Sequence, residues 1–568
     1  MGQRPVVVTH RPDAGPAAAW IGPLIVGIVA AGLGVWRLMP GVGFWDTAEF
    51  QTVPPLLGTA HPTGYPTYVI LGWLASTLLS PFGEAAFRMN LLSALLVGVA
   101  AGVSVDLVRR LTGSTVLGIV AGLGLAATPI VWRIATHADP HALHLVFVAL
   151  LLWLLVRWDE ARLATPGRVD RWLVAAAAVT GLSVGNHSLT FLLGIPVGLY
   201  VLAVEPGLFR RGRLVAACAV ALIVPMVLVY LELPLRGGAI PGLRADLVYG
   251  KPDTLAGFVY VVTGEQFRGG IVDPFGDLPR KLADLSALAA RELGPLAVLV
   301  LAGLFVTAVR FPAYALLTGT TVAITCFFNA AYVNADIERY YLGPALVAWT
   351  WLAILAATVV DGVTGRSLAR PVAAGSDAPD EGAAEPAAIA TSQPPGPEPS
   401  RDAGLRVAHV PARRLAFDAF GAAATGLAAV LLIAPTVAAF PTRAGEVDRT
   451  TDRSAEVWLD DVLDRVEPEA TIVSWWSYST SLWYAQHIQG RRLDVFVADD
   501  RTRLDLNLGE LTDVIDGNLA IDRPVYAIRV DGAELAMLGT RYSLTPLDSV
   551  VAANVFRVTP RAPLGVAP

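Results

Sequence analysis

The fold is decided by the stretch WIGPLIVGIVAAGLGVWRLM at residues 20–39, which is soon followed by GFWDTAEF at residues 43–50. Its length matches the roughly 20 apolar residues that cross a bilayer as a helix. It lacks the short apolar core and small-residue cleavage site of a signal peptide, so we expect a retained span. The two acids that follow, Asp46 and Glu49, therefore lie at a membrane surface.

The composition indicates a protein with many membrane spans. The chain has 568 residues, of which 54% are hydrophobic and only 16% are charged, whereas soluble domains carry about 25% charged residues. A net charge of -6 argues against a nucleic-acid partner, which would need a basic face. Cys218 and Cys326 both lie in apolar segments, so we interpret them as buried small side chains.

We expect about eleven transmembrane helices. Each apolar run is close to the length that a bilayer requires, although the fifth and sixth are short enough to be tilted or partly re-entrant. The runs lie at residues 18–39, 87–108, 114–132, 141–157, 172–186, 188–204, 213–232, 293–309, 312–332, 341–361 and 414–436.

Arginine-rich loops set the expected orientation. They follow the even-numbered spans, as at Arg109-Arg110 and at Arg210-Arg211, and cytoplasmic loops carry such an excess. This places the N-terminus in the cytoplasm and the first loop outside the plasma membrane. Residues 66–82 are apolar too, but counting them as a span would invert every later loop, so we expect a helix along the outer interface.

Four parts of the chain follow from this topology. Residues 1–362 form the transmembrane module, and residues 414–437 form the last transmembrane helix. Between them, residues 363–413 are rich in Ala, Pro, Gly and Glu, which predicts a disordered cytoplasmic linker. Residues 438–568 are then a soluble domain outside the membrane.

The sequence predicts that the soluble domain is a small α/β domain. Buried strands are predicted at 471–475, 494–498 and 524–528, and helices at 478–489 and 507–520. Strands that alternate with helices favour a parallel sheet. Aspartates 499 and 500 follow a strand, where ligands of such sheets bind, but we favour a simple turn.

The acids in the first loop are the strongest chemical signal. Asp46 and Glu49 are three residues apart, so a helix would place both on one side. One acid could deprotonate a hydroxyl acceptor while the other orients it or helps to hold a metal. The alternative is a helix start at which the dipole favours acids. The sequence identifies no cofactor with certainty, and a divalent cation stays an alternative.

The other outer loops carry more polar side chains at the ends of spans. Each alone could be a solvated interfacial charge, but polar groups at this depth are expensive and often functional. Together they suit an anionic ligand that is held by arginine and acted on by a carboxylate. They are His61, His137, Asp139, Asn186, His187, Arg236 and Arg339.

These residues carry a family resemblance. WDTAEF at 45–50 and HPTGYPTY at 61–68 resemble the D-x-G-E-F and H-P-P-G-Y-P-L-Y signature of a large bacterial family of unknown function, which is related to the transmembrane protein O-mannosyltransferases. Residues 138–144 and 185–190 resemble two further motifs of that family. The signature glycine is Ala48 here, and Asp139-Pro140-His141 replaces Glu-Val-Tyr.

The resemblance implies a glycosyltransferase-C fold and a sugar donor on polyprenyl phosphate. Asp46 would be the general base, Glu49 would orient it or the acceptor, and Arg339 or Arg236 would neutralise the lipid phosphate. The expected sugar is mannose, the acceptor is a protein or a glycan, and membrane lipids surround the enzyme. The sugar pocket would be formed by His61, Tyr65, His137, Asp139, Asn186 and His187.

Two other functions compete with the transferase. A transporter or lipid flippase is expected to place ionisable groups near the bilayer midplane, whereas here they cluster at the outer ends of the spans. A non-catalytic membrane anchor for the C-terminal domain would leave Asp46 and Glu49 without a role.

Overall fold

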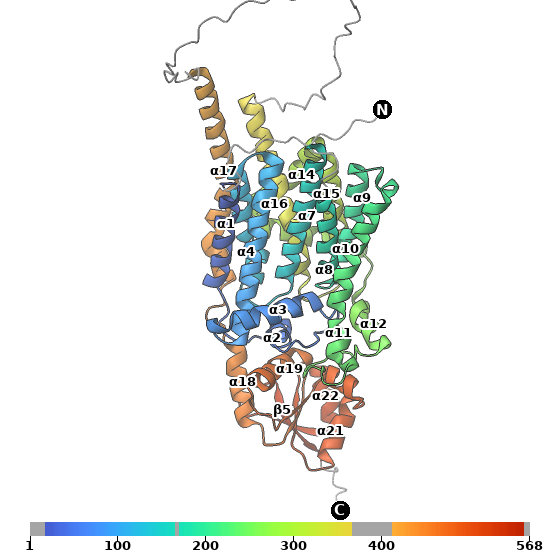
Figure 1. The fold of residues 1–568 in the computed structure, drawn as a ribbon. Helices are drawn as coiled ribbons and strands as arrows, with labels where there is room; N and C mark the ends of the chain where they lie inside the picture. Colours follow the sequence, from blue (N-terminus) through green and yellow to red (C-terminus); the bar gives the residue numbers. More distant parts are fainter. Residues whose placement is uncertain (1–17, 165–169, 366–411, 562–568) are drawn as a thin grey trace, which may run out of the picture.

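The computed structural model describes residues 18–164, 170–365 and 412–561. They form a long helical bundle with a small α/β domain at one end (Figure 1). The expected linker at 363–413 falls almost entirely on residues 366–411, outside the described residues, and stays a prediction.

The bundle agrees with the expected spans. Within the described residues, seven helical segments are long and apolar enough to cross a membrane, and four shorter apolar helices occupy the remaining expected positions. The protein is therefore a multi-span membrane protein. Its bundle helices are α1 (Ile21–Trp36), α4 (Ala85–Thr112), α5 (Thr115–Ala126), α7 (His141–Ala164), α8 (Arg171–Val184), α9 (Gly194–Val204), α10 (Gly212–Tyr230), α14 (Val300–Arg310), α15 (Pro312–Ala330), α16 (Leu342–Thr364) and α17 (Ala412–Glu446).

Small residues bring the first two bundle helices into close contact. A Cβ added at Gly98 of α4 would lie 2.6 Å from the carbonyl oxygen of Gly27 in α1. One added at Gly102 would lie 2.8 Å from the carbonyl oxygen of Pro23. Such small-residue seams stabilise helix pairs in lipid, where the hydrophobic effect between helices is absent. Helix α4 ends at Gly113, which has the left-handed φ of 72° that favours glycine.

Two short helices lie across the end of the bundle (Figure 1). They are α2 (Trp45–Thr52) and α3 (Pro66–Leu78). At 1.5 Å per residue, the 13 residues of α3 extend about 20 Å, which is too short for a span. Trp73, Leu74 and Leu78 of α3 are exposed, as expected for a helix at a membrane interface.

The segment before α14 differs from the expectation. The spans expected at 213–232 and 293–309 leave residues 278–291 in a long loop, but α13 (Leu278–Leu293) is a 16-residue helix there. Its buried residues are confined to its C-terminal end, at Glu292 and Leu293. A one-sided, largely exposed helix lacks the continuous apolar run by which we recognised the spans, and this explains why it was missed.

The C-terminal domain contains a mixed five-stranded sheet in the order β2-β1-β3-β5-β4. The predicted strands appear as β1 (Thr471–Val473), β2 (Phe496–Ala498) and β3 (Val525–Ile528), and they are parallel. The prediction of a purely parallel sheet was wrong, because β4 (Tyr542–Pro546) and β5 (Val555–Pro560) add an antiparallel pair. Both are only partly buried, so they lack the apolar runs that identified the other three.

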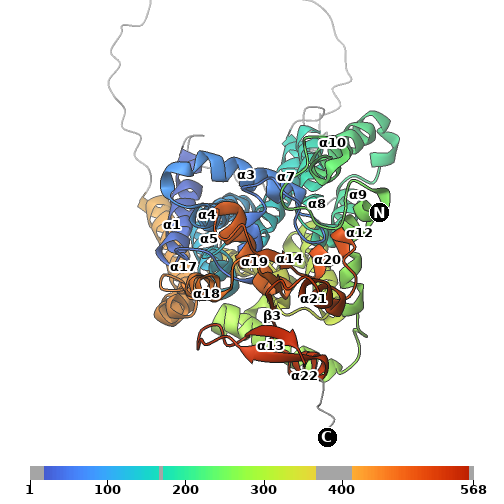
Figure 2. The ribbon, with the colours of Figure 1, turned by 90° about the horizontal axis from the view of Figure 1, so that it is seen from below.

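Five helices complete this domain. They are α18 (Ser454–Arg465), α19 (Trp476–Trp483), α20 (Asp500–Leu506), α21 (Leu511–Leu519) and α22 (Gly532–Arg541). Viewed from this end, α18, α19 and α21 lie in front of the bundle (Figure 2). The helix predicted at 507–520 is in fact α21, preceded by a left-handed turn at Asn507 and Gly509.

The domain packs directly on the first loop of the bundle. Ser481 of α19 donates a hydrogen bond of 2.8 Å to the carbonyl oxygen of Gly43. The ring of Phe44 packs edge-on against Trp458 of α18 and Tyr478 of α19, with centroids 5.6 and 5.4 Å away. Aromatic pairs of this geometry add to the stability gained by burial. The domain is thus placed against the loop that carries Asp46 and Glu49.

Candidate active site

Helix α2 places the two acids of the first loop in different surroundings. Both lie on the helix that their spacing predicted. The side chain of Asp46 is 28% exposed, whereas Glu49 is 1% exposed. Since the two carboxylates have different hydrogen-bond partners, they belong to two separate charge clusters.

Glu49 forms a buried pair with His61. Its Oε1 accepts a hydrogen bond of 2.8 Å from the backbone N–H of His61, and its Oε2 lies against Nδ1 of the same residue. On the other side of the imidazole, Nε2 lies 3.3 Å from the hydroxyl of Tyr65. Burial alone would lower the pKa of His61, but the Glu49 carboxylate outweighs burial and raises it. The pair fixes the loop between α2 and α3.

Asp46 forms an ion pair with Arg339, from the segment Ile337–Tyr341 that precedes α16. Nη2 of Arg339 lies 2.9 Å from Oδ2 of Asp46 and 3.2 Å from Oδ2 of Asp336. Its Nη1 lies 3.5 Å from Oδ2 of Asp139. One guanidinium therefore bridges three carboxylates from three different parts of the chain.

The bridge determines the protonation of its acids. Burial would raise the pKa of Asp46, but the charge and hydrogen bond of Arg339 and the charge of His61 together outweigh it and hold the pKa below its usual range. Burial opposes ionisation of Asp139 too, yet His141 and Arg339 together keep its pKa well below the ordinary value. Both acids are therefore carboxylates at neutral pH and can accept a proton or a hydrogen bond.

Asp139 is held firmly in place. Its Oδ1 accepts hydrogen bonds of 2.8 Å from both the backbone N–H and Nδ1 of His141. Its own backbone N–H donates to Oγ of Ser93 in α4, at 3.0 Å. Nε2 of His137 lies 3.8 Å from Oδ2 of Asp139, and burial lowers the pKa of His137 to about 4. His137 is thus neutral at physiological pH.

Histidine and tyrosine rings line the space beside the bridge. The ring of His187 lies 4.8 Å from that of His141, 5.4 Å from that of Tyr65 and 5.7 Å from that of Tyr340. Burial lowers the pKa of His187 well below its usual value. Nδ1 of His187 accepts a hydrogen bond of 3.0 Å from the backbone N–H of Leu189, so Nε2 of the neutral ring carries the proton and can donate to a sugar hydroxyl.

Asn186 is fully buried beside these rings. Its Nδ2 donates a hydrogen bond of 3.2 Å to the carbonyl oxygen of Pro140, while its Oδ1 has no partner among the described residues. A buried acceptor without a partner is costly, so such atoms mark sites where a ligand or water binds. The structure thus groups Asp46, Asp139, Asn186 and His187 with their neighbours at one end of the bundle.

Arg236 lies outside this group of contacts. Its guanidinium donates three hydrogen bonds to backbone carbonyl oxygens, at 2.7 Å to Leu57, 3.2 Å to Leu56 and 2.8 Å to Leu243. The bonds to Leu56 and Leu57 tie the loop after α10 to the loop between α2 and α3. Arg236 therefore supports the loop that carries the acids, and of the two arginines only Arg339 contacts Asp46.

The described residues offer no cluster of three or more His, Cys, Asp or Glu side chains arranged to hold a metal ion. At the place where Asp46, Asp139 and Asp336 converge, the charge opposite the acids is supplied by Arg339.

The C-terminal domain contributes a residue that sequence reasoning missed. The indole of Trp476, the first residue of α19, lies edge-on to the imidazole of His61 at 5.4 Å. Its signal in the sequence is the pair Trp475-Trp476 directly after a buried strand. The soluble domain is thus part of the wall around the acidic loop. Tyr340, which stacks at 5.6 Å on His141, was missed as well.

Comparisons with known proteins agree with this arrangement. The family described as "Protein O-mannosyl-transferase TMEM260 N-terminal domain" matches residues 46–207, a stretch that begins at Asp46. The chain is 32% identical to protein O-mannosyl-transferase TMEM260 of Mus musculus over 270 residues, which is 44% of this chain and 36% of the relative. It is 22% identical over 255 residues to the protein of the same name from Dictyostelium discoideum, covering 42% of this chain and 30% of the relative. The matches thus span about a third of the length of these relatives.

Solved structures share the fold of the whole chain. ArnT from Cupriavidus metallidurans in the apo state has a TM-score of 0.54 at 15% identity, over 96% of this chain and 98% of that one. ArnT bound to undecaprenyl phosphate gives 0.53 at 16% identity, over 95% and 98%. The chain therefore has the glycosyltransferase-C fold that the sequence resemblance predicted, with a small mixed-sheet domain at its C-terminal end, and it is related to the TMEM260 O-mannosyltransferases.

Proposed function

We propose that the chain is a membrane glycosyltransferase that moves a sugar, with mannose as the expected one, from a polyprenyl-phosphate donor to a hydroxyl of a protein or glycan. The relationship to O-mannosyltransferases over residues 46–207 supports the reaction class. The fold shared with ArnT, one structure of which contains undecaprenyl phosphate, supports a donor of that type.

The observation that carries the proposal is the bridge from Asp46 through Arg339 to Asp139. It combines a carboxylate that is 28% exposed with a cation suited to a phosphate oxygen. An arginine can hold a phosphate through two parallel hydrogen bonds. Base and anion-binding group thus lie side by side, as the transfer requires.

The reaction uses these groups in a defined order. The donor phosphate competes with Asp46 for Arg339, which removes the charge that lowers the Asp46 pKa and so increases the proton affinity of the carboxylate. The acceptor oxygen forms its bond to C1 of the sugar as its proton passes to Asp46. The bond from C1 to the phosphate oxygen breaks, and its electron pair stays on the phosphate, which Arg339 neutralises.

The other residues would position the two substrates. Glu49, through His61, holds the loop on which Asp46 lies. Asp139 is the second carboxylate on Arg339 and would keep the guanidinium in place when Asp46 releases it. The sugar would lie against the neutral rings and the unpartnered amide oxygen, that is, beside Tyr65, His137, Asn186 and His187.

We assign this end of the bundle to the outer face of the plasma membrane. The loops at the opposite ends of the helices carry Arg109, Arg110, Arg210, Arg211 and Arg310, and arginine-rich loops are typical of the cytoplasmic side. A lipid-linked donor fits this side, because its phosphate stays at headgroup level beside Arg339.

The proposal accounts for the site better than the two alternatives. A transporter or flippase is expected to hold its ionisable groups between the halves of a repeat near the midplane, whereas Asp46 of the charged bridge lies on α2 and Arg339 lies in the segment before α16. An inert anchor gives no reason for a cation shared among three acids.

Sugar transfer by the purified full-length protein tests the assignment. With polyprenyl-phosphate mannose radiolabelled in the sugar, Asp46→Asn should lower the transfer rate about 10²- to 10⁴-fold, the usual contribution of a general base. Asp336→Asn is the matched control, since Asp336 contacts the same guanidinium but is 60% exposed. An unchanged rate in Asp46→Asn would refute the catalytic assignment.

The orientation is tested separately by thiol labelling. In a protein whose Cys218 and Cys326 are replaced by alanine, Trp45→Cys introduces a thiol at an exposed position beside Asp46. A membrane-impermeant maleimide should modify it from outside intact cells. Modification only after the membrane is opened would overturn the topology and with it the choice of donor.

A further inference from the structure

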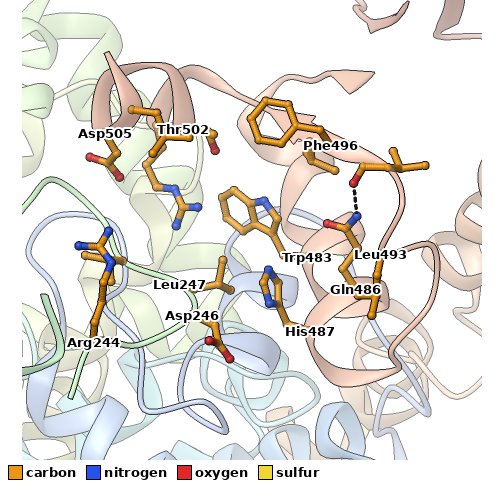
Figure 3. A pocket seen from close by; sticks show the side chains of 15 residues that line it. Arg244, Asp246, Leu247, Trp483, Gln486, His487, Leu493, Phe496, Thr502 and Asp505 are labelled. Atoms are coloured by element: carbon orange, nitrogen blue, oxygen red, sulfur yellow. Dashed lines mark hydrogen bonds between the residues drawn. The ribbon is translucent and has the colours of Figure 1, made fainter. Parts of the chain in front are cut away.

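A cavity of about 340 Å³ separates the C-terminal domain from the loop after α10. Figure 3 shows the labelled side chains of Arg244 and Asp246 from that loop on one side, and those of Trp483, His487 and Phe496 from the domain on the other. A volume of this size holds a few side chains or a short stretch of main chain.

Arg501 is the unusual residue of this cavity. It is 91% buried, and its guanidinium forms no hydrogen bond or ion pair with any of the described residues. The guanidinium instead stacks on the indole of Trp483 at 4.2 Å and lies 6.0 Å from the ring centre of Tyr249. The carboxylates of Asp499 and Asp505 are near enough to interact with the charge of Arg501. Its Nε is nevertheless buried without a hydrogen-bond partner among the described residues, which points to an oxyanion that is supplied by a ligand.

Acceptors and apolar groups also line the cavity, and Asp505 lies one helical turn after Arg501 on α20. Asp505 accepts a hydrogen bond of 3.2 Å from the backbone N–H of Gly250 and keeps its second oxygen for other donors. Asp246 also lines the cavity, and the remaining wall includes Leu493 and Phe496. A ligand that matches this wall carries a carboxylate for Arg501, N–H donors for the aspartates and apolar side chains.

That combination describes a polypeptide better than a saccharide. The indole of Trp483 is 2% exposed and its face is covered by Arg501, so it is no platform for a sugar ring. The second lining arginine, Arg244, donates a hydrogen bond of 2.9 Å to the carbonyl oxygen of Gly237. Apolar side chains beside Arg501 instead suit an acidic residue with apolar neighbours.

Helix α19 links the cavity to the acidic loop. Its first residue, Trp476, contacts His61, and its last, Trp483, lines the cavity. The two indoles are seven residues apart, which is about 10 Å along a helix. A peptide bound in the cavity therefore lies within a few residues' reach of the candidate active site.

We propose that this cavity binds a segment of the acceptor protein, with an Asp or Glu side chain of the segment on Arg501. The inference rests on the proposed function, because only a transferase has an acceptor, but peptide binding itself requires no sugar transfer. In this proposal the C-terminal domain selects the polypeptide that accepts the sugar.

Peptide binding to the detergent-solubilised full-length protein tests this site. The probes are fluorescein-labelled peptides of about nine residues with a Ser/Thr core and Leu neighbours, made in pairs with Glu or Gln at one flanking position. By fluorescence polarisation, the Glu peptide of at least one pair should bind the wild type about tenfold more tightly than its Gln partner. Arg501→Gln should reduce this preference to less than about twofold.

Arg503→Gln is the matched control, because Arg503 lies on the same short helix but is paired with Asp500. It should keep the preference for the Glu peptide, as should Asp46→Asn, which separates this test from that of the catalytic assignment. Equal binding of the Glu and Gln peptides by the wild type would overturn the proposal. So would a preference that survives in an Arg501→Gln protein whose thermal unfolding is unchanged.

Discussion

Two buried arginines at the same end of the molecule have opposite surroundings. Arg339 lies within 3.5 Å of three carboxylates, whereas Arg501 has no polar partner among the described residues. A cation that is shared among acids can exchange one of them for a substrate phosphate without becoming uncompensated. A buried cation that forms no ion pair within the described residues is available for a permanent ligand contact. We infer chemistry at the first arginine and recognition at the second.

Arg339→Gln should have the largest effect of the substitutions that test this comparison. It leaves Asp46 and Asp139 without their cation and removes the contact proposed for the donor phosphate. Loss of one such stabilising group costs about 10²- to 10³-fold in rate, and donor binding should weaken as well. Transfer assays and binding of radiolabelled donor measure the two effects.

Arg133→Gln provides the control for that substitution. Arg133 lies at the same end of the bundle and pairs with Glu338 at 3.1 Å, but it contacts none of the three aspartates. It should retain donor binding. If Arg133→Gln and Arg339→Gln were equally impaired, the special role of the bridge would be lost.

Glu49→Gln should destabilise the protein in a pH-dependent manner. The raised pKa of His61 in the folded state means that the charged pair contributes its full stability below the unfolded pKa of about 6.5. This contribution disappears as the pH rises through the folded pKa. The wild type should therefore lose thermal stability between neutral and alkaline pH by more than Glu49→Gln does.

Removal of one partner of a buried charged pair costs about 3–5 kcal/mol. Thermal unfolding of both proteins at several pH values measures the difference. Identical pH profiles would show that His61 does not carry a Glu49-dependent proton.

Trp476→Ala should have a moderate effect on transfer. The indole contributes an edge-on contact to His61, and such contacts are worth about 0.5–1.5 kcal/mol, or up to roughly tenfold in rate. Trp475→Ala is the neighbouring control, because no aromatic contact of its ring to His61 is found in the described structure. Equal effects of the two substitutions on the transfer rate would mean that the soluble domain only packs on the loop.

Arg501→Gln should have the smallest effect on turnover. At saturating acceptor the rate should stay within about twofold of the wild type, while KM for an acidic acceptor protein should rise. This split between kcat and KM separates recognition from chemistry. A large fall in kcat with KM unchanged would contradict the contrast between the two arginines.

The spans were predictable from the sequence because each is a long apolar run. Residues 66–82 were expected to form an interface helix for a different reason, since counting them as a span would invert the later arginine-rich loops, and α3 is indeed too short for a span. Asp46 and Glu49 were also predicted to share one face of a helix, because their three-residue spacing is a local signal, and both lie on the short helix α2. The antiparallel strands β4 and β5 were not predicted because they are half-exposed, and α13 was not predicted because it is not a continuous apolar run.

Contacts between residues that are far apart in the sequence could not be predicted from residue spacing. Glu49 was expected to orient Asp46 or the acceptor, but its hydrogen bonds go to His61. Arg236 and Arg339 look alike in the sequence, yet one binds backbone carbonyls and the other binds Asp46. Trp476 reaches His61 across more than 400 residues of chain, through the docking of a whole domain.

The most direct measurement compares donor binding and sugar transfer in one preparation of Asp46→Asn. With radiolabelled polyprenyl-phosphate mannose, the variant should bind the donor within about threefold of the wild type. Its transfer rate should nevertheless fall about 10²- to 10⁴-fold, because Arg339 still contacts the phosphate while the base is gone. Transfer at the wild-type rate, or a loss of transfer that only follows a loss of donor binding, would contradict the account.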